Sequence, residues 1–141
     1  MRSWRLAGLA VVLMPLLLPH EAGAARRNLV VFYDANYSVR YGGDPEPALR
    51  YFQAQGFQHL DTRGLLAWFE RTIKDGQAPA SAVVQLSDIT PTLLVLPWDK
   101  TSPLYRYCEA GGRFVAPAGT PLYGFEDETG IAVKNQGGAD A

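Results

Sequence analysis

Cysteine and histidine are nearly absent from this sequence. It contains one cysteine, Cys108, and two histidines, of which only His59 lies outside the first 24 residues. A single cysteine cannot form an internal disulfide, so the hydrophobic core alone must stabilise the fold. A lone histidine gives little support to a metal centre, because such sites need several clustered ligands. The sequence therefore predicts no disulfide framework, no metal and no cofactor.

A strong excess of one charge is also missing. The 13 basic side chains are balanced by 14 acidic ones, which leaves a formal net charge of −1 at pH 7. The basic residues form no block or stripe along the chain. Surfaces that bind nucleic acid carry clustered Lys and Arg, so the sequence predicts that nucleic acid is not a partner.

The chain has no apolar run long enough to span a bilayer as a helix. Its longest run, from Leu6 to Leu18, is shorter than the roughly 20 residues needed and contains Pro15. Arg2 and Arg5 precede this run, and the small residues Ala22-Gly23-Ala24 follow it. This order predicts a secretory signal peptide over residues 1–24. We expect a periplasmic or secreted protein that meets the membrane only through this transient segment.

Short apolar runs alternate with amphipathic stretches in residues 25–125, which predicts one α/β domain. Runs of this kind are typical of strands buried on both faces of a parallel sheet. Residues 92–98 fit a strand or a helical turn equally well, and residues 126–141 read as a flexible, acidic, Gly-rich tail without a core-facing pattern. The predicted strands are 28–34, 57–60, 82–86 and 113–116, and the predicted helices are 45–55, 62–75 and 103–110.

Capping residues and helical spacing support these helices. Asp44 before Pro45 is a typical helix start, as is Asp61 or Thr62 for the next helix. Gly56 predicts a left-handed helix end. In the third helix, Leu104, Tyr107 and Cys108 recur at helical spacing, so we expect the thiol to pack on the apolar face as a small hydrophobe.

The order of these elements predicts a flavodoxin-like fold, a mainly parallel sheet of four to five strands with helices on both sides. A complete unit has five strands, so the chain would be a trimmed or an incomplete version. Ligands of such sheets bind beyond the carboxyl ends of the strands, here between the first and third strands. The candidate ligand-binding residues there are Asp34, Asn36, Tyr37, Asp88, Thr90, Thr120 and Tyr123.

Two interpretations of the acidic candidates stay open. Asp34 and Asp88 fit the acid and base of a glycan-directed hydrolase if they lie about 5 to 9 Å apart. They also fit a purely structural role, because aspartate commonly caps turns and helix starts. His59 lacks catalytic partners nearby in the sequence, and the pattern places it away from this edge.

Several motifs in their order resemble exported class I glutamine amidotransferase-like domains. The resemblance covers about residues 28–125. The motifs are Gly42-Gly43, Leu60-Asp61 before Leu65-Leu66-Ala67-Trp68, Ala82-Val83-Val84 followed by Asp88-Ile89-Thr90-Pro91, the run Tyr105-Arg106-Tyr107-Cys108-Glu109-Ala110-Gly111-Gly112-Arg113-Phe114-Val115, and the loop Gly119-Thr120-Pro121-Leu122-Tyr123.

The resemblance implies a flavodoxin-like sheet but not glutaminase activity. Amidotransferases carry a cysteine in the loop where this chain has Ala118-Gly119-Thr120, and no histidine follows that loop. Nucleophile and base must both be present for acyl transfer. We therefore expect a pseudoenzyme, a non-catalytic binding or assembly module of the kind that accompanies carbohydrate or cell-surface processes. Its partner would be a small molecule, a glycan or a protein.

Overall fold

The computed structural model describes residues 28–37, 43–87, 89–96, 99–116, 124–130 and 132–134. The predicted signal peptide therefore lies outside the described residues. The strands are β1 (Leu29–Phe32), β2 (Gln58–Leu60), β3 (Ala82–Gln85), β4 (Ile89–Pro91), β5 (Arg113–Val115), β6 (Gly124–Glu126) and β7 (Ala132–Lys134). The helices are α2 (Glu46–Ala54), α3 (Thr62–Lys74), the short 3-10 helix η2 (Ala78–Ala80) and α4 (Pro103–Glu109).

A four-stranded parallel sheet forms the centre of the fold. Its strand order is β2-β1-β3-β5, and all three pairings are parallel. The chain leaves β1 for the outer strand β2, then crosses back to β3 on the other side of β1. The order therefore reverses between β1 and β3, as the sequence predicts. The α/β class, with a mainly parallel, flavodoxin-like sheet, is confirmed.

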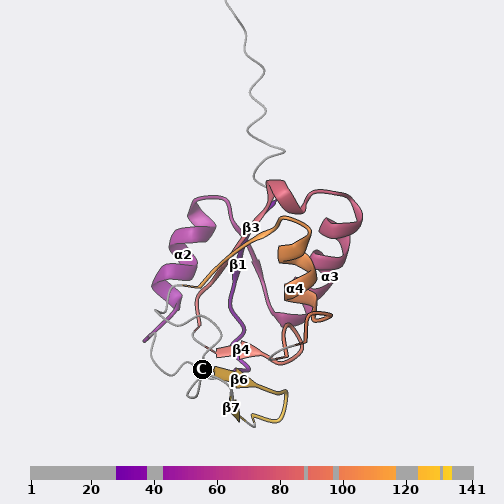
Figure 1. Ribbon diagram of the computed structural model, residues 1–141. Helices are drawn as coiled ribbons and strands as arrows, with labels where there is room; N and C mark the ends of the chain where they lie inside the picture. The colour runs from indigo at the N-terminus through magenta and orange to yellow at the C-terminus, as the bar shows by residue number, and fades with distance from the viewer. Residues whose placement is uncertain are drawn as a thin grey trace, which may run out of the picture.

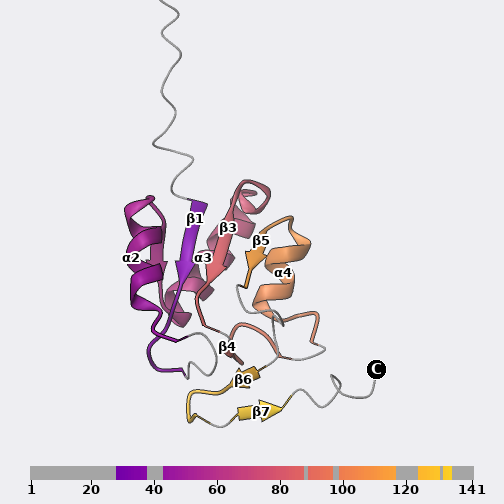
Figure 2. The same ribbon diagram turned by 90° about the vertical axis from the view of Figure 1, so that its left-hand side faces the viewer.

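Helices cover both faces of this sheet (Figure 1). The face of Val30, Phe32 and Val83 packs against α3 and α4 in the larger core cluster. The opposite face, with Val31, packs against Leu49 of α2 in a smaller cluster. Alternate residues of β1 point to opposite faces, which is why a continuous apolar run suits a strand covered on both sides. Figure 2 shows α2 beside β1, with β3 and β5 further from it.

The helix boundaries follow the capping residues. The Asp61 side chain accepts a hydrogen bond from the Gly64 amide at 2.7 Å and caps α3. The predicted start of α2 was wrong by one residue: Pro45, not Asp44, occupies the N-cap position and the helix begins at Glu46, although the Asp44 side chain still accepts from the Glu46 amide at 3.0 Å. Gly56 has a φ of 89°, which confirms the left-handed helix end. No helix within the described ranges combines the length and apolar character that a bilayer crossing requires.

A second, smaller sheet was not expected. β4 pairs with β6 in parallel, and β6 pairs with β7 antiparallel. The sequence assigned residues 126–141 to a flexible tail, yet Glu126 ends a buried strand and residues 132–134 form β7. Figure 1 places this sheet below the carboxyl ends of the main strands. These strands are only three residues long, too short for a period-two pattern to stand out in the sequence.

The prediction for Cys108 was wrong. Leu104 and Tyr107 are the buried residues of α4, whereas Cys108 is exposed. The Tyr107 ring occupies the contact with α3, stacked on Phe69 with 4.5 Å between ring centroids. Because helical neighbours diverge by about 100°, the residue after Tyr107 turns out of this contact. The thiol therefore is not part of the core.

Candidate functional site

The described part of the candidate site lies where β1 ends. Asp34, Asn36 and Tyr37 follow this strand directly, at the carboxyl edge of the sheet beside the reversal point. Asp34 and Tyr37 are each 8% exposed, while Asn36 is exposed. Asp88, Thr120 and Tyr123 lie outside the described residues. Of the predicted site residues, the structure therefore describes Thr90 and the three that follow β1.

The Asp34 carboxylate joins the end of β1 to the start of α3. One oxygen, Oδ1, accepts hydrogen bonds from the Asn36 backbone amide at 3.0 Å and from the Asn36 side-chain Nδ2 at 2.9 Å. The other oxygen, Oδ2, accepts from the Thr62 backbone amide at 3.1 Å. The Thr62 amide is one of the helix-start N–H groups that lack a partner within the helix. Asp34 thus holds a turn on one side and a helix start on the other.

These donors keep Asp34 ionised. Burial by itself would raise the pKa of the carboxyl, but the hydrogen bonds from Thr62 and Asn36 outweigh it and hold the pKa below its ordinary value. The Thr62 hydroxyl faces Asp34 and Tyr37 and contributes to this environment, although it makes no well-aligned hydrogen bond. Burial, followed by the nearby Asp34 charge, raises the pKa of the Tyr37 phenol, which stays protonated.

Two exposed contacts form the rim of this edge. Arg63, in the first turn of α3, lies 3.5 Å from Glu128 in the turn between β6 and β7, and both side chains are mostly exposed. Such a surface ion pair contributes little stability. His59 lies within β2, beside β1, and its Nε2 is 2.9 Å from the Tyr33 carbonyl oxygen. His59 is therefore close to this edge. The sequence pattern placed it away from the edge, and that prediction was wrong.

Thr90 belongs to a buried network at the end of β3. Its hydroxyl is bonded to the Gln85 side chain, and it is fully buried. The Gln85 Nε2 also donates to the carbonyl oxygens of Ser87 at 2.6 Å and of Ile89 at 3.1 Å. This network fixes the turn that carries the chain from β3 into β4. Thr90 thus holds the fold together and does not present its hydroxyl to a ligand.

Replacing Gln85 with leucine is expected to lower the free energy of unfolding by about 2 kcal/mol. Leucine fills a similar volume, but the Ser87 carbonyl oxygen and the buried Thr90 hydroxyl lose their Gln85 partner, whereas the Ile89 carbonyl keeps a donor in Ser87 Oγ. Urea unfolding at neutral pH measures the loss. The same change at the exposed Gln53 of α2 should stay within about 0.5 kcal/mol of the wild type. Equal effects at the two positions would contradict a structural role for the network.

The described residues offer no activated nucleophile at this edge. Cys108 lies in the last turn of α4, just before β5 begins, and therefore near the opposite, amino-terminal end of the sheet. Although the residue is exposed, partial burial of the thiol raises its pKa, which disfavours the reactive thiolate. Within the described ranges, no three His, Cys, Asp or Glu side chains gather closely enough to hold a metal ion.

Fold and site together define a doubly wound α/β domain whose reversal point carries a hydrogen-bonded aspartate. Comparison with known proteins adds nothing to this: no protein-family model, no curated protein and no solved structure matches the chain significantly. Function must therefore be argued from the geometry of the site alone.

Sequence reasoning found Asp34, Asn36 and Tyr37 but missed two residues that organise the edge. Thr62 supplies the amide that binds Asp34, whereas the sequence pattern indicates Thr62 only as a possible helix cap. Gln85 is the single polar residue of the apolar strand β3, and this polar residue is the signal that could have identified the network. A buried polar residue needs hydrogen-bond partners, so a glutamine inside an apolar run indicates a local network.

Proposed function

We propose that this protein is an exported, non-catalytic binding or assembly module, similar to class I glutamine amidotransferase-like domains without their chemistry. The observation that supports the proposal is the state of Asp34. Its three hydrogen-bond donors and lowered pKa make it a structural clamp at the point where such sheets usually bind ligands. A carboxylate used in this way is a weak base and a poor proton donor.

The binding surface of this module lies on the β1–β2 side of the carboxyl edge. Among the described residues, β4 and β6 lie beyond the carboxyl ends of β3 and β5 (Figure 2), and the turn that follows β6 contacts the start of α3 through Glu128 and Arg63. Exposed Asn36, His59 and Arg63 offer hydrogen-bond donors and acceptors there. A small molecule, a glycan or a protein segment would be recognised through these groups.

A glycan-directed hydrolase that uses Asp34 and Asp88 is the less supported function. Its general acid needs a raised pKa so that it holds a proton near neutral pH. The hydrogen bonds to Asp34 lower its pKa instead. The hydrolase would then need Asp88 as its acid, and Asp34→Asn would abolish turnover while the fold remained intact.

Thermal unfolding of the full chain against a panel of glycans, peptides and small metabolites tests the binding function. A bound ligand at about 100 times its dissociation constant adds about 2.7 kcal/mol, which raises the midpoint by several degrees. Asn36→Ala should remove this rise, because Asn36 is exposed at the edge, whereas Gln53→Ala on α2 should keep it. A rise that survives Asn36→Ala, His59→Ala and Arg63→Ala together would contradict a site at this edge.

A further inference from the structure

A concave surface lies at the opposite, amino-terminal end of the sheet. It is an open cleft of about 340 Å³ between the start of the strands and the carboxyl-terminal half of α3. Asn28 precedes β1, Gln58 begins β2, and Gln77 follows α3, and all three line the cleft. Its volume is at the lower end of the range for small-molecule sites. We refer to it as the amino-edge cleft.

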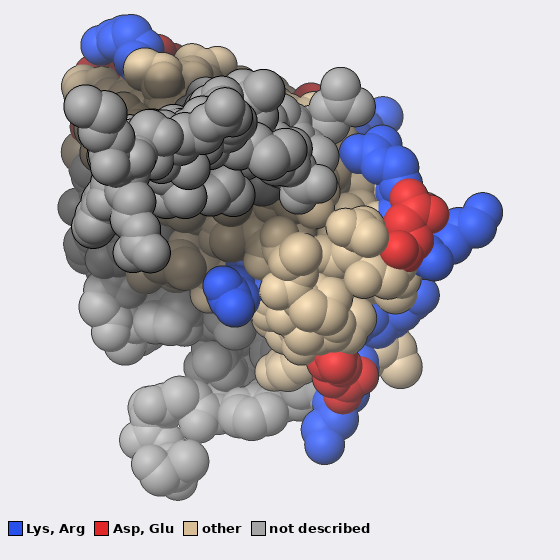
Figure 3. Space-filling view, turned by 90° about the horizontal axis from the view of Figure 1, so that it is seen from above, with Lys and Arg blue, Asp and Glu red and all other residues tan. Residues whose placement is uncertain are grey.

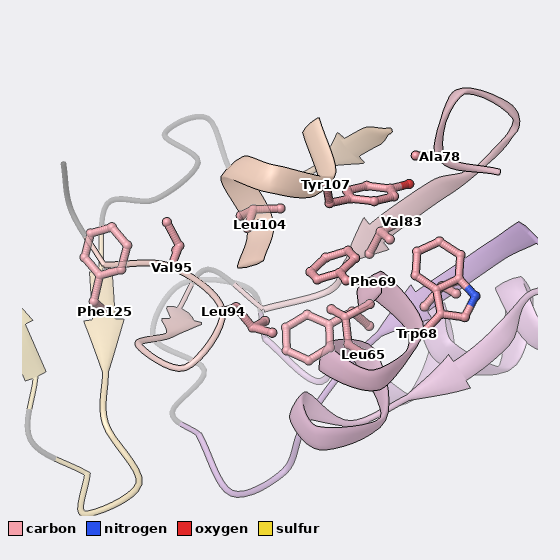
Figure 4. Packing of buried hydrophobic residues seen from close by; sticks show 12 residues of the cluster. Leu65, Trp68, Phe69, Ala78, Val83, Leu94, Val95, Leu104, Tyr107 and Phe125 are labelled. Carbon is pink, nitrogen blue, oxygen red and sulfur yellow. The ribbon is translucent and has the colours of Figure 1, made fainter. Parts of the chain in front are cut away.

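Trp68 and Thr72 of α3 also line the cleft. They are 2% and 4% exposed. Within the described residues, neither the indole N–H of Trp68 nor the Thr72 hydroxyl makes a hydrogen bond. Figure 4 shows the indole nitrogen on the edge of the ring turned away from Phe69 and Leu65. In the described part of the chain, Thr62 Oγ1 is the one buried side-chain polar atom without a partner, so the Trp68 and Thr72 polar atoms are not sealed in the core but are accessible to a ligand or solvent atom in the cleft.

Three carboxamides give the cleft both donors and acceptors. The Asn28 Nδ2 donates to the Gln77 Oε1 at a long 3.4 Å, a weak bond that a ligand can replace. The Gln58 side chain is exposed beside them at the start of β2. Each carboxamide carries two donor hydrogens and an acceptor oxygen. The cleft can therefore bind a ligand that alternates donors and acceptors over a short distance.

The charges of the cleft cancel. Arg71 and Asp75 lie one helical turn apart on its rim, and within the described residues neither is in an ion pair. Figure 3 looks down on this end of the molecule and shows blue basic and red acidic side chains together rather than a field of one sign. A simple anion would be repelled by Asp75 and a simple cation by Arg71. The electrostatics favour a neutral ligand with several hydrogen-bonding groups.

We propose that the amino-edge cleft binds a neutral polyhydroxylated small molecule, a single pyranose unit in size. Each hydroxyl is both donor and acceptor, which matches the three carboxamides, and a sugar oxygen would accept from the Trp68 indole N–H. Arg71 and Asp75 would bind neighbouring hydroxyls as donor and acceptor. This site lies at the end of the sheet opposite Asp34 and is independent of the function proposed for that edge.

The indole N–H resonance of Trp68 is the direct test. The chain has three tryptophans, so Trp4→Phe and Trp98→Phe variants of the full chain assign the third indole signal. Glucose, galactose, mannose and N-acetylglucosamine are then titrated as probes. At least one sugar should shift the Trp68 signal saturably, with a dissociation constant of about 1 mM for so small a ligand.

Two pairs of matched variants separate this site from nonspecific effects. Arg71→Ala and Gln77→Ala should each weaken sugar binding about threefold to tenfold, as expected for one lost hydrogen bond. Arg50→Ala and Gln53→Ala on the exposed side of α2 should leave it unchanged. Circular dichroism and unfolding midpoints show whether each variant is folded.

Three results would overturn the proposal. The first is no shift of the Trp68 indole signal with any of the four sugars up to their solubility. The second is a shift produced by sodium acetate or glycine but not by the sugars, which would mean a charged ligand. The third is that the cleft variants and the α2 control variants weaken sugar binding to the same extent. Because the readout is the Trp68 signal, the result does not depend on whether the Asp34 edge binds a ligand.

Discussion

Replacing Gly112 with alanine is expected to lower the free energy of unfolding by about 3 kcal/mol. A Cβ built at this position overlaps the ring of Tyr107. That ring cannot move aside, because it is fully buried, stacks on Phe69 and forms a 2.8 Å hydrogen bond between its hydroxyl and Ser81 Oγ. Overpacking of a filled core commonly costs about 1 to 3 kcal/mol. Because both the stacking on Phe69 and the hydrogen bond to Ser81 hold the Tyr107 ring in place, we expect a cost near the top of this range. Urea unfolding measures the change.

Gly124 provides the matched control for this substitution. A Cβ there would also overlap a side chain, but the atom it meets is the terminal Cδ1 of Ile89, which can change rotamer. Gly124→Ala should therefore cost less than about 1 kcal/mol, partly offset because alanine loses less entropy on folding than glycine. A cost at Gly112 equal to or below that at Gly124 would show that Tyr107 is not rigidly held.

Replacing Asp34 with alanine is expected to cost about 3 kcal/mol at neutral pH. The change removes three hydrogen bonds to a charged acceptor and leaves the buried Thr62 amide without a partner. Asp34→Asn should cost less, because one amide oxygen can still accept from either the turn or the helix start. Asp99→Ala is the control, since Asp99 holds a similar but exposed turn at Thr101, and its loss should be clearly smaller.

The contribution of Asp34 should also depend on pH. Its pKa is lower in the folded protein than in the unfolded chain, so its stabilisation is present above the unfolded value and is lost as the pH falls through the folded value. Wild-type stability should therefore decline below about pH 4, and this part of the decline should be missing in Asp34→Asn. Urea unfolding from pH 7 to acidic pH measures both slopes. Parallel curves would mean that Asp34 makes no net favourable contact.

The central sheet could be predicted because its strands are locally distinctive. β1 and β3 are short apolar runs, and helices with recognisable caps separate them, so the alternation of strand and helix predicts their parallel pairing. α3 illustrates the same point, since Asp61 caps its start and a left-handed glycine, Gly76, follows its end. In these segments local preference and tertiary packing favour the same structure.

The second sheet could not be predicted in this way. β4, β6 and β7 are each three residues long, and β4 contains a proline, which disfavours a strand assignment. Their pairing joins residues that are far apart in the sequence, such as Ile89 and Gly124. Short strands of this kind are held by their neighbours rather than by their own composition.

The candidate site was likewise predicted only in part. The sequence predicted correctly that Asp34, Asn36 and Tyr37 lie together at the carboxyl edge, because residues that follow a parallel strand must lie there. It did not predict that the Thr62 amide would donate to the Asp34 carboxylate. Nor did it predict that the Gln85 side chain would form a buried hydrogen bond with the Thr90 hydroxyl. Both contacts depend on where a neighbouring element begins, and the periodicity of the chain does not contain that information.

The sequence by itself determined the α/β class, the order of the central strands and the edge at which Asp34 lies, because apolar periodicity, caps and glycines act within a few residues. Only the tertiary structure decided what the polar groups do there. It turned Asp34 into a clamp, buried Thr90, exposed Cys108 and gathered Trp68, Thr72 and three carboxamides around one cleft. Hydrogen-bond satisfaction and exposure depend on neighbours that are distant in the chain, and only the packed fold brings those neighbours together.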